Sequence, residues 1–109
     1  MNYTDRSVTI RLPRRIDGYT AHFLMADLNE KIQKGSTIVL DMTHTQHVEM
    51  DSVHVFRLGL VKSRERKARL TLRGVQPQIS KALKTAGVLD LFRRKPTEQT
   101  RQRTPVKAR

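Results

Sequence analysis

The sequence contains no cysteine and no tryptophan, and only five of its 109 residues are tyrosine or phenylalanine. Without cysteine, a disulfide-bonded secreted scaffold, a thiolate metal site and a cysteine nucleophile are all excluded. Long apolar runs are also missing, since no uninterrupted stretch approaches the roughly 20 residues that span a bilayer. Residues 1–10 alternate polar and apolar side chains and lack the apolar core of a signal peptide. We therefore expect a cytoplasmic protein without a transmembrane segment.

Acidic residues are scarce, because 10 Asp and Glu stand against 22 Lys and Arg, which gives a formal net charge of +12. Residues 93–109 carry seven basic side chains and one acidic one, with two prolines and almost no apolar content. Such a segment cannot offset the entropy of its own ordering, so we expect a disordered basic arm. It either keeps the chain in solution or contacts an acidic partner, and no aromatic residue is present for base stacking. The basic residues singled out are Arg93, Arg94, Lys95, Arg101 and Arg103.

Hydrophobic periodicity before the arm predicts strands that alternate with helices. Two stretches alternate apolar and polar residues, as a strand with one buried face does, and one is a continuous apolar run typical of a central strand. Between them, apolar residues recur at the spacing of one helix face. The strands are predicted at 7–12, 37–40 and 69–73, and the helices around 21–32, 53–60 and 79–86. This order predicts a single α/β domain over residues 1–92 with parallel strand pairs.

The patterns of catalytic and metal sites are weak or missing. The five glycines stand far apart, so no phosphate-binding glycine loop is present. His44, His47 and His54 lie in or near a polar loop, where such residues are more often solvated than bound to a metal. Asp51 and Ser52 precede His54 directly, but neighbours in sequence rarely align as a hydrolase triad. We expect no enzyme, no cofactor and no metal.

The segment that stands out is Met50-Asp51-Ser52, which follows the predicted central strand ending at Asp41 and precedes a helix. A serine hydroxyl at a helix start can cap the helix. A phosphate at the same place would meet free backbone N–H groups and would add about two negative charges to the surface. Capping and modification of Ser52 both stay open at this point.

Residues 7–92 resemble a STAS domain, the family of sulfate transporters and anti-sigma factor antagonists. The resemblance rests on the strand ending in Leu40-Asp41, the motif Met50-Asp51-Ser52, the stretch Leu70-Thr71-Leu72-Arg73-Gly74-Val75, and the closing stretch Leu83-Lys84-Thr85-Ala86-Gly87-Val88-Leu89-Asp90-Leu91-Phe92. It implies an α/β fold with a small mixed sheet of four to five strands and helices packed against it. Where the family commonly reads Asp-Ser-Ser-Gly or Asp-Ser-Ala-Gly, this chain reads Asp51-Ser52-Val53-His54.

The resemblance further implies a regulatory binding module, an anti-sigma factor antagonist in a partner-switching circuit. Its partner would be an anti-sigma factor with kinase activity, which phosphorylates the serine that corresponds to Ser52. The expected partner-binding residues are Asp41, Asp51, Ser52, Val53, His54 and Arg57.

The alternative hypothesis is an adaptor with the same fold that does not switch. It would bind an acidic protein, a nucleic acid or an anionic membrane surface through the arm and a basic face on the second helix. That face consists of Arg57, Lys62, Arg64, Arg66, Lys67 and Arg69.

Overall fold

Three parallel strands form the main sheet of the computed structural model, which describes residues 6–93. In order across the sheet they are β1 (Arg6–Arg11), β3 (Ser36–Asp41) and β5 (Arg69–Arg73). Successive side chains of a strand point to opposite faces, and two cross-strand rows of apolar residues lie on the same face. These rows are Val8-Ile38-Leu70 and Ile10-Leu40-Leu72. The hydrophobic core is built on this face.

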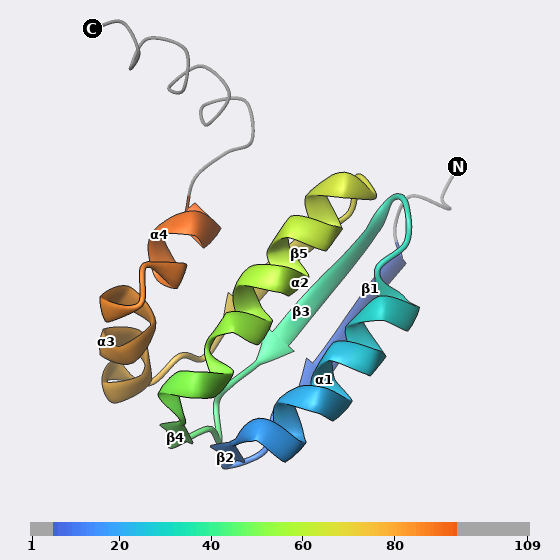
Figure 1. Cartoon of the computed structure of the whole chain (residues 1–109). Coiled ribbons are helices and arrows are strands. Elements are labelled where there is room, and N and C mark those ends of the chain that lie inside the picture. The colour runs from blue at the N-terminus through green and yellow to red at the C-terminus, as the bar shows by residue number, and fades with distance from the viewer. Residues whose placement is uncertain (1–5, 94–109) are drawn as a thin grey trace, which may run out of the picture.

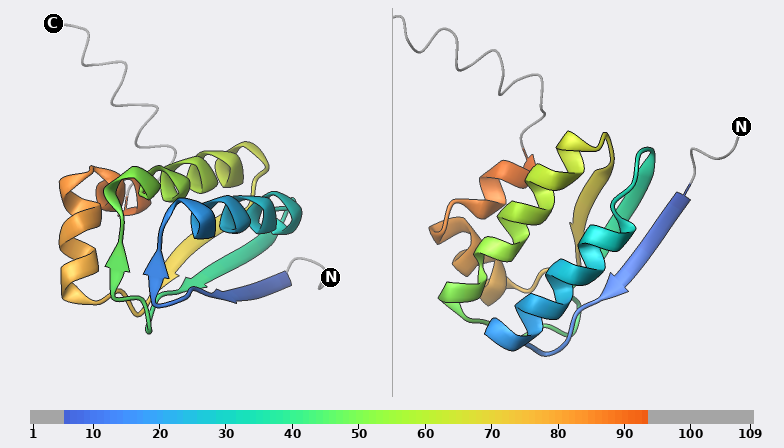
Figure 2. Two further views of the ribbon diagram at one scale, coloured as in Figure 1. Left: turned by 60° about the horizontal axis from the view of Figure 1, so that its bottom comes forward. Right: turned by 45° about the vertical axis from the view of Figure 1, so that its right-hand side comes forward.

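Helices α1 (Gly18–Lys31) and α2 (His54–Glu65) cover that face side by side, and each connects two parallel strands (Figures 1 and 2). At the start of α1, the Asp17 carboxylate accepts hydrogen bonds from the backbone N–H and the hydroxyl of Thr20, at 2.9 and 3.0 Å. These bonds cap the helix and lower the pKa of Asp17. The opposite face of the sheet carries no helix in the part of the chain that the structure describes (Figure 2).

Two short helices follow β5, α3 (Pro77–Thr85) and α4 (Val88–Arg93), and α4 packs against α2. Pro77 lies in the first turn of α3, where its missing N–H costs nothing. Val88 and Leu89 are buried, so the apolar segment at the end of the domain completes the core.

Two further strands, β2 (Arg15–Ile16) and β4 (His47–Val48), pair in parallel with each other and form a second sheet. The α/β fold class is thereby confirmed, and the five strands agree with the expected four to five. The described strands pair only in parallel and are divided between two sheets, so they do not form the single mixed sheet that the resemblance implied. Hydrophobic periodicity predicted only the three longer strands, and it predicted their parallel pairing. The arm residues Arg94, Lys95, Arg101 and Arg103 lie outside the described residues, whereas Arg93 ends α4.

Candidate functional site

The segment singled out in the sequence lies at the carboxyl end of the main sheet. From the end of β3 the chain runs through β4 and a short 3-10 helix, η2 (Met50–Ser52), into α2. The start of α1 lies at the same end of the sheet and contacts η2 (Figure 1). This end therefore gathers the starts of both covering helices and the loop between β3 and α2.

Asp41 ends β3 and is buried, with its side chain 10% exposed. Its carboxylate accepts hydrogen bonds from the backbone N–H (3.0 Å) and the hydroxyl of Thr43, and from Arg73 at 3.2 Å. Arg11 lies 4.0 Å away. The Thr43 hydrogen bonds, helped by Arg73, lower the pKa of Asp41 to about 2. Asp41 thus uses both carboxylate oxygens to join β1, β3 and β5, a structural role beside the expected partner contact.

Ser52 ends η2 and is only 1% exposed. Its backbone N–H donates to the Glu49 carbonyl at 2.8 Å and closes the 3-10 turn. The hydroxyl is buried and has no hydrogen-bond partner within residues 6–93. Val53, not Ser52, stands at the N-cap of α2, which has no side-chain cap. The interpretation of Ser52 as a helix cap is therefore wrong, whereas its modification stays a prediction.

Three of the expected partner-binding residues, Asp51, His54 and Arg57, follow one another at helical spacing and are exposed. The Nδ1 atom of His54 donates a hydrogen bond to the Asp51 carbonyl at 2.7 Å, which fixes the start of α2. Val53 is 3% exposed and belongs to the core. The structure thus divides the motif into an outer side that a partner can reach and an inner side, Ser52 and Val53, that it cannot.

The large hydrophobic side chains that are exposed in the described chain all lie on α1, η2 and α2. They are Tyr19 (76% exposed), Phe23 (56%), Met50 (56%), Leu58 (47%) and Val61 (47%). We call these five residues the α1–α2 outer surface. Tyr19 and Phe23 contact each other edge to face, with ring centroids 5.0 Å apart. Apart from Met50, the sequence analysis did not single out these residues, although Tyr19 and Phe23 fall outside the buried stripe of α1 and could have signalled this surface.

A hollow of about 250 Å³ lies where α1 meets the start of α2. It is lined by Ala21, His22, Met25, His54, Val55 and Leu58. The lining thus combines two exposed histidines with four apolar side chains, of which Met25 is half-buried. An opening of this kind can receive a side chain of a partner.

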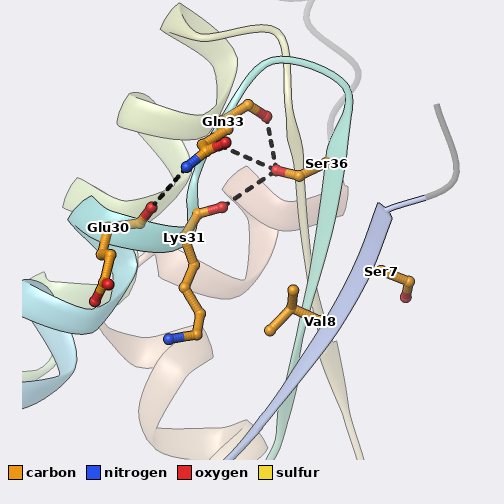
Figure 3. A pocket seen from close by; sticks show the side chains of 6 residues that line it. All are labelled: Ser7, Val8, Glu30, Lys31, Gln33 and Ser36. Atoms are coloured by element: carbon orange, nitrogen blue, oxygen red, sulfur yellow. Dashed lines mark hydrogen bonds between the residues drawn. The ribbon is translucent and has the colours of Figure 1, made fainter. Parts of the chain in front are cut away.

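A second hollow, of about 400 Å³, lies at the opposite end of the sheet, beside β1 and the end of α1 (Figure 3). The hydroxyl of Ser36 donates to the Gln33 carbonyl at 2.7 Å and accepts from the Gln33 backbone N–H at 3.1 Å. The ammonium of Lys31 lies 2.7 Å from the Asp27 carboxylate. These groups serve the end of α1 and the start of β3, so this hollow does not offer a converging set of free polar groups.

The basic face expected on α2 is partly used by the fold itself. Arg64 donates to the Leu91 carbonyl of α4 at 2.9 Å. Arg66 donates to the carbonyls of Asn29 and Ile32 at 3.0 Å each and satisfies the end of α1. Of the other members, Arg57 and Lys62 lie on α2, whereas Lys67 lies in the turn after α2 and Arg69 begins β5. The expectation that all six form one face of the second helix is therefore wrong, because α2 ends at Glu65. Two of the six basic residues thus hold helices together.

A comparison with protein families decides what kind of domain this is: the family model of the STAS domain matches residues 1–103. The chain belongs to the STAS domain family. A crystal structure of a sulfate transporter family protein from Wolinella succinogenes is similar, with a TM-score of 0.66 and 18% sequence identity over 82% of this chain and 71% of that chain. At this identity the likeness concerns the fold. Among curated proteins, no sequence matches significantly.

Membership in the STAS family supports a general regulatory or binding role through protein–protein interaction, and STAS domains are generally non-catalytic. Within residues 6–93, no cluster of three or more His, Asp or Glu side chains could hold a metal ion. None of the helices in this region has the length and hydrophobicity to span a bilayer. What this STAS domain offers is therefore a pair of helices with an exposed apolar surface beside the Ser52 motif.

Proposed function

We propose that this STAS domain is an anti-sigma factor antagonist that binds its partner through the α1–α2 outer surface and the exposed side of η2. One observation carries the proposal: all five large hydrophobic residues that are exposed within residues 6–93 lie on α1, η2 and α2, close to Ser52 in the fold. Tyrosine, phenylalanine and methionine are enriched in protein–protein interfaces, and exposed apolar side chains that gather on one face are typical of binding sites. The partner is an anti-sigma factor with kinase activity.

The burial of Ser52 supports a switch that acts through structure as well as charge. A phosphate does not fit on the buried hydroxyl of a residue that is 1% exposed, so phosphorylation requires η2 to open. Met50 belongs to the same 3-10 turn as Ser52. The modified serine would displace Met50 from the α1–α2 outer surface and would place about two negative charges beside Asp51. Both effects would weaken binding of the partner that recognises the unmodified protein.

The test is capture of partners from native cell extract on the immobilised full chain, with bound proteins identified by mass spectrometry. We expect a kinase-type anti-sigma factor on the unmodified protein and its loss with Ser52→Asp and with Phe23→Ala. Thr85→Asp, an exposed site at the end of α3, adds the same charge away from the surface and should retain the partner.

Incubation of the captured kinase with ATP should then phosphorylate Ser52 and release the protein. Retention of the same partners by Ser52→Asp and Phe23→Ala, both folded by circular dichroism, would contradict the proposal.

A further inference from the structure

The side of the main sheet opposite the helices is uncovered within the described residues (Figure 2). Three cross-strand rows form it, Ser7-Thr37-Arg69, Thr9-Val39-Thr71 and Arg11-Asp41-Arg73. We call these nine residues the open face. Its members on β1 and β5 are exposed, and those on β3 are half-buried or buried. All-parallel sheets occur almost only with both faces covered, so an uncovered one is an unusual surface.

The open face is positively charged. It holds three arginines and one acidic residue, Asp41, whose side chain is only 10% exposed. The side chains of Arg11 and Arg73 are 72% and 59% exposed although both lie beside Asp41. The negative charge is therefore held inside the sheet while the guanidinium groups face solvent. Between the arginines, Thr9, Val39 and Thr71 form a flat, β-branched centre.

The dimensions of the open face suit one segment of chain. Three strands spaced by about 4.8 Å, with about 3.3 Å per residue along each, give a patch of about 14 by 20 Å. This is much smaller than the roughly 800 Å² that each partner buries in a standard protein interface. One extended strand or one helix fits it.

Charge decides among the occupants. A second copy would place arginines against arginines, and the chain's own residues 94–109 contain six basic residues and one glutamate. Both would be repelled. The face carries no aromatic side chain on which a nucleic-acid base could stack. We infer that the open face binds an acidic segment of another protein, whose carboxylates meet Arg11, Arg69 and Arg73.

This surface is separate from the proposed partner site, because the sheet lies between it and α1 and α2. The experiment is a titration of the isotope-labelled full chain with an oligoglutamate peptide at low salt, followed by NMR. We expect amide shifts at Thr9, Thr71 and Arg73, with little change at Phe23 and Leu58. The affinity should fall steeply with added salt.

Matched variants separate a site from general attraction. Arg69→Glu should weaken binding about tenfold, whereas Lys81→Glu, an equal change of charge on exposed α3, should change it less than about twofold. Well-dispersed spectra of both variants report that the fold is retained. Equal effects of the two variants, or shifts confined to other faces, would overturn the inference. Tighter binding of oligothymidine than of oligoglutamate at the same residues would overturn the choice of a protein segment.

Discussion

Ser52 and Asp41 stand at the two ends of one loop and have opposite surroundings. Asp41 receives hydrogen bonds on both carboxylate oxygens, whereas the buried hydroxyl of Ser52 receives none from the described chain. An unsatisfied buried hydroxyl costs free energy, of the order of 1–3 kcal/mol. At the scale of single residues, the fold is therefore anchored at Asp41 and weakened at Ser52, the residue that the proposed switch must expose.

Replacement of Ser52 by alanine should leave the free energy of unfolding unchanged or raise it by up to about 1 kcal/mol, because it removes the unpaired hydroxyl. If Ser52 capped the helix, the same replacement would instead lower the free energy of unfolding by about 1 kcal/mol. Ser63→Ala is the matched control, since the buried Ser63 hydroxyl donates to the Leu60 carbonyl at 2.7 Å. It should lose about 1 kcal/mol. Urea unfolding of both variants gives the answer, and a clear loss for Ser52→Ala would count against the buried geometry.

Gly74 supports the loop that holds Asp41. Its φ is 70°, and a Cβ at this position would overlap the Thr43 hydroxyl and lie 3.1 Å from Thr43 Cα. Gly35 has a φ of 83° but open space around its Cβ position. Gly35→Ala should lower the free energy of unfolding by about 1 kcal/mol, because alanine is strained in the left-handed backbone conformation. Gly74→Ala should lower it by about 3 kcal/mol, because its Cβ would also overlap Thr43. Equal midpoints of chemical unfolding for the two variants would contradict this, because they would show that the loop around Thr43 moves to accept the Cβ without loss of stability.

At the scale of elements, the sequence predicts those that are long enough to show a period. Strands of five or six residues, such as β3, show a run or an alternation of apolar residues, and helices such as α1 show a buried stripe. Strands β2 and β4 have two residues each, so no alternation can be seen in them. The burial of Ser52 was missed for a related reason. A 3-10 turn rotates side chains differently from an α-helix, and three residues do not reveal which form the chain adopts.

The outer strand β1 provides a test of the sheet itself. The backbone N–H of Leu12 points toward β3, because it donates to the Asp41 carbonyl at 2.9 Å. Backbone amides along a strand point alternately to its two sides, so the amide of Thr9, three residues earlier, points away from β3. In central β3, by the same register, the amide of Thr37 points toward β1. Thr37→Pro removes a hydrogen bond between β3 and β1, whereas Thr9→Pro removes none within the sheet. Thr37→Pro should therefore lower the free energy of unfolding by at least about 2 kcal/mol more than Thr9→Pro. Comparable losses in thermal unfolding would mean that the outer edge of β1 is paired.

At the scale of the whole molecule, the sheet separates two proposed binding surfaces. The α1–α2 outer surface is apolar and lies beside the Ser52 motif. The open face is basic and is the side of the sheet that faces away from these helices. A partner on one side does not obstruct the other. The domain could therefore hold an acidic segment while it exchanges the partner on its helices.

The stability of the whole domain should depend on pH through Asp41. Its pKa is about 2 in the folded chain against an ordinary value of 3.8, so the unfolded chain binds the proton more readily. The stabilisation is complete above about pH 4 and is lost as the pH falls through about 2. Asp41→Asn should abolish this part of the pH dependence. Thr43→Val removes one hydrogen-bond donor to Asp41, so the pKa of Asp41 in the folded chain should rise toward its ordinary value and the pH range over which stability is lost should become narrower. The measurement is the midpoint of urea unfolding at several pH values between these two. If the midpoint changes with pH equally in the unmodified protein and in Asp41→Asn, Asp41 is not the source of this pH dependence.

All the strand pairs described here are parallel and connect distant parts of the chain. Arg6 pairs with Ser36, Arg15 with His47 and Thr37 with Arg69, so each pair joins residues 30 or 32 positions apart. Residues 6–93 contain no local hairpin that could start the sheet, and each pairing must first close a long loop. Folding should therefore be slow for a domain of this size, and α1 and α2 should form part of its transition state. During synthesis, β1 has no partner in the main sheet until β3 has left the ribosome, and its apolar face stays exposed for that time.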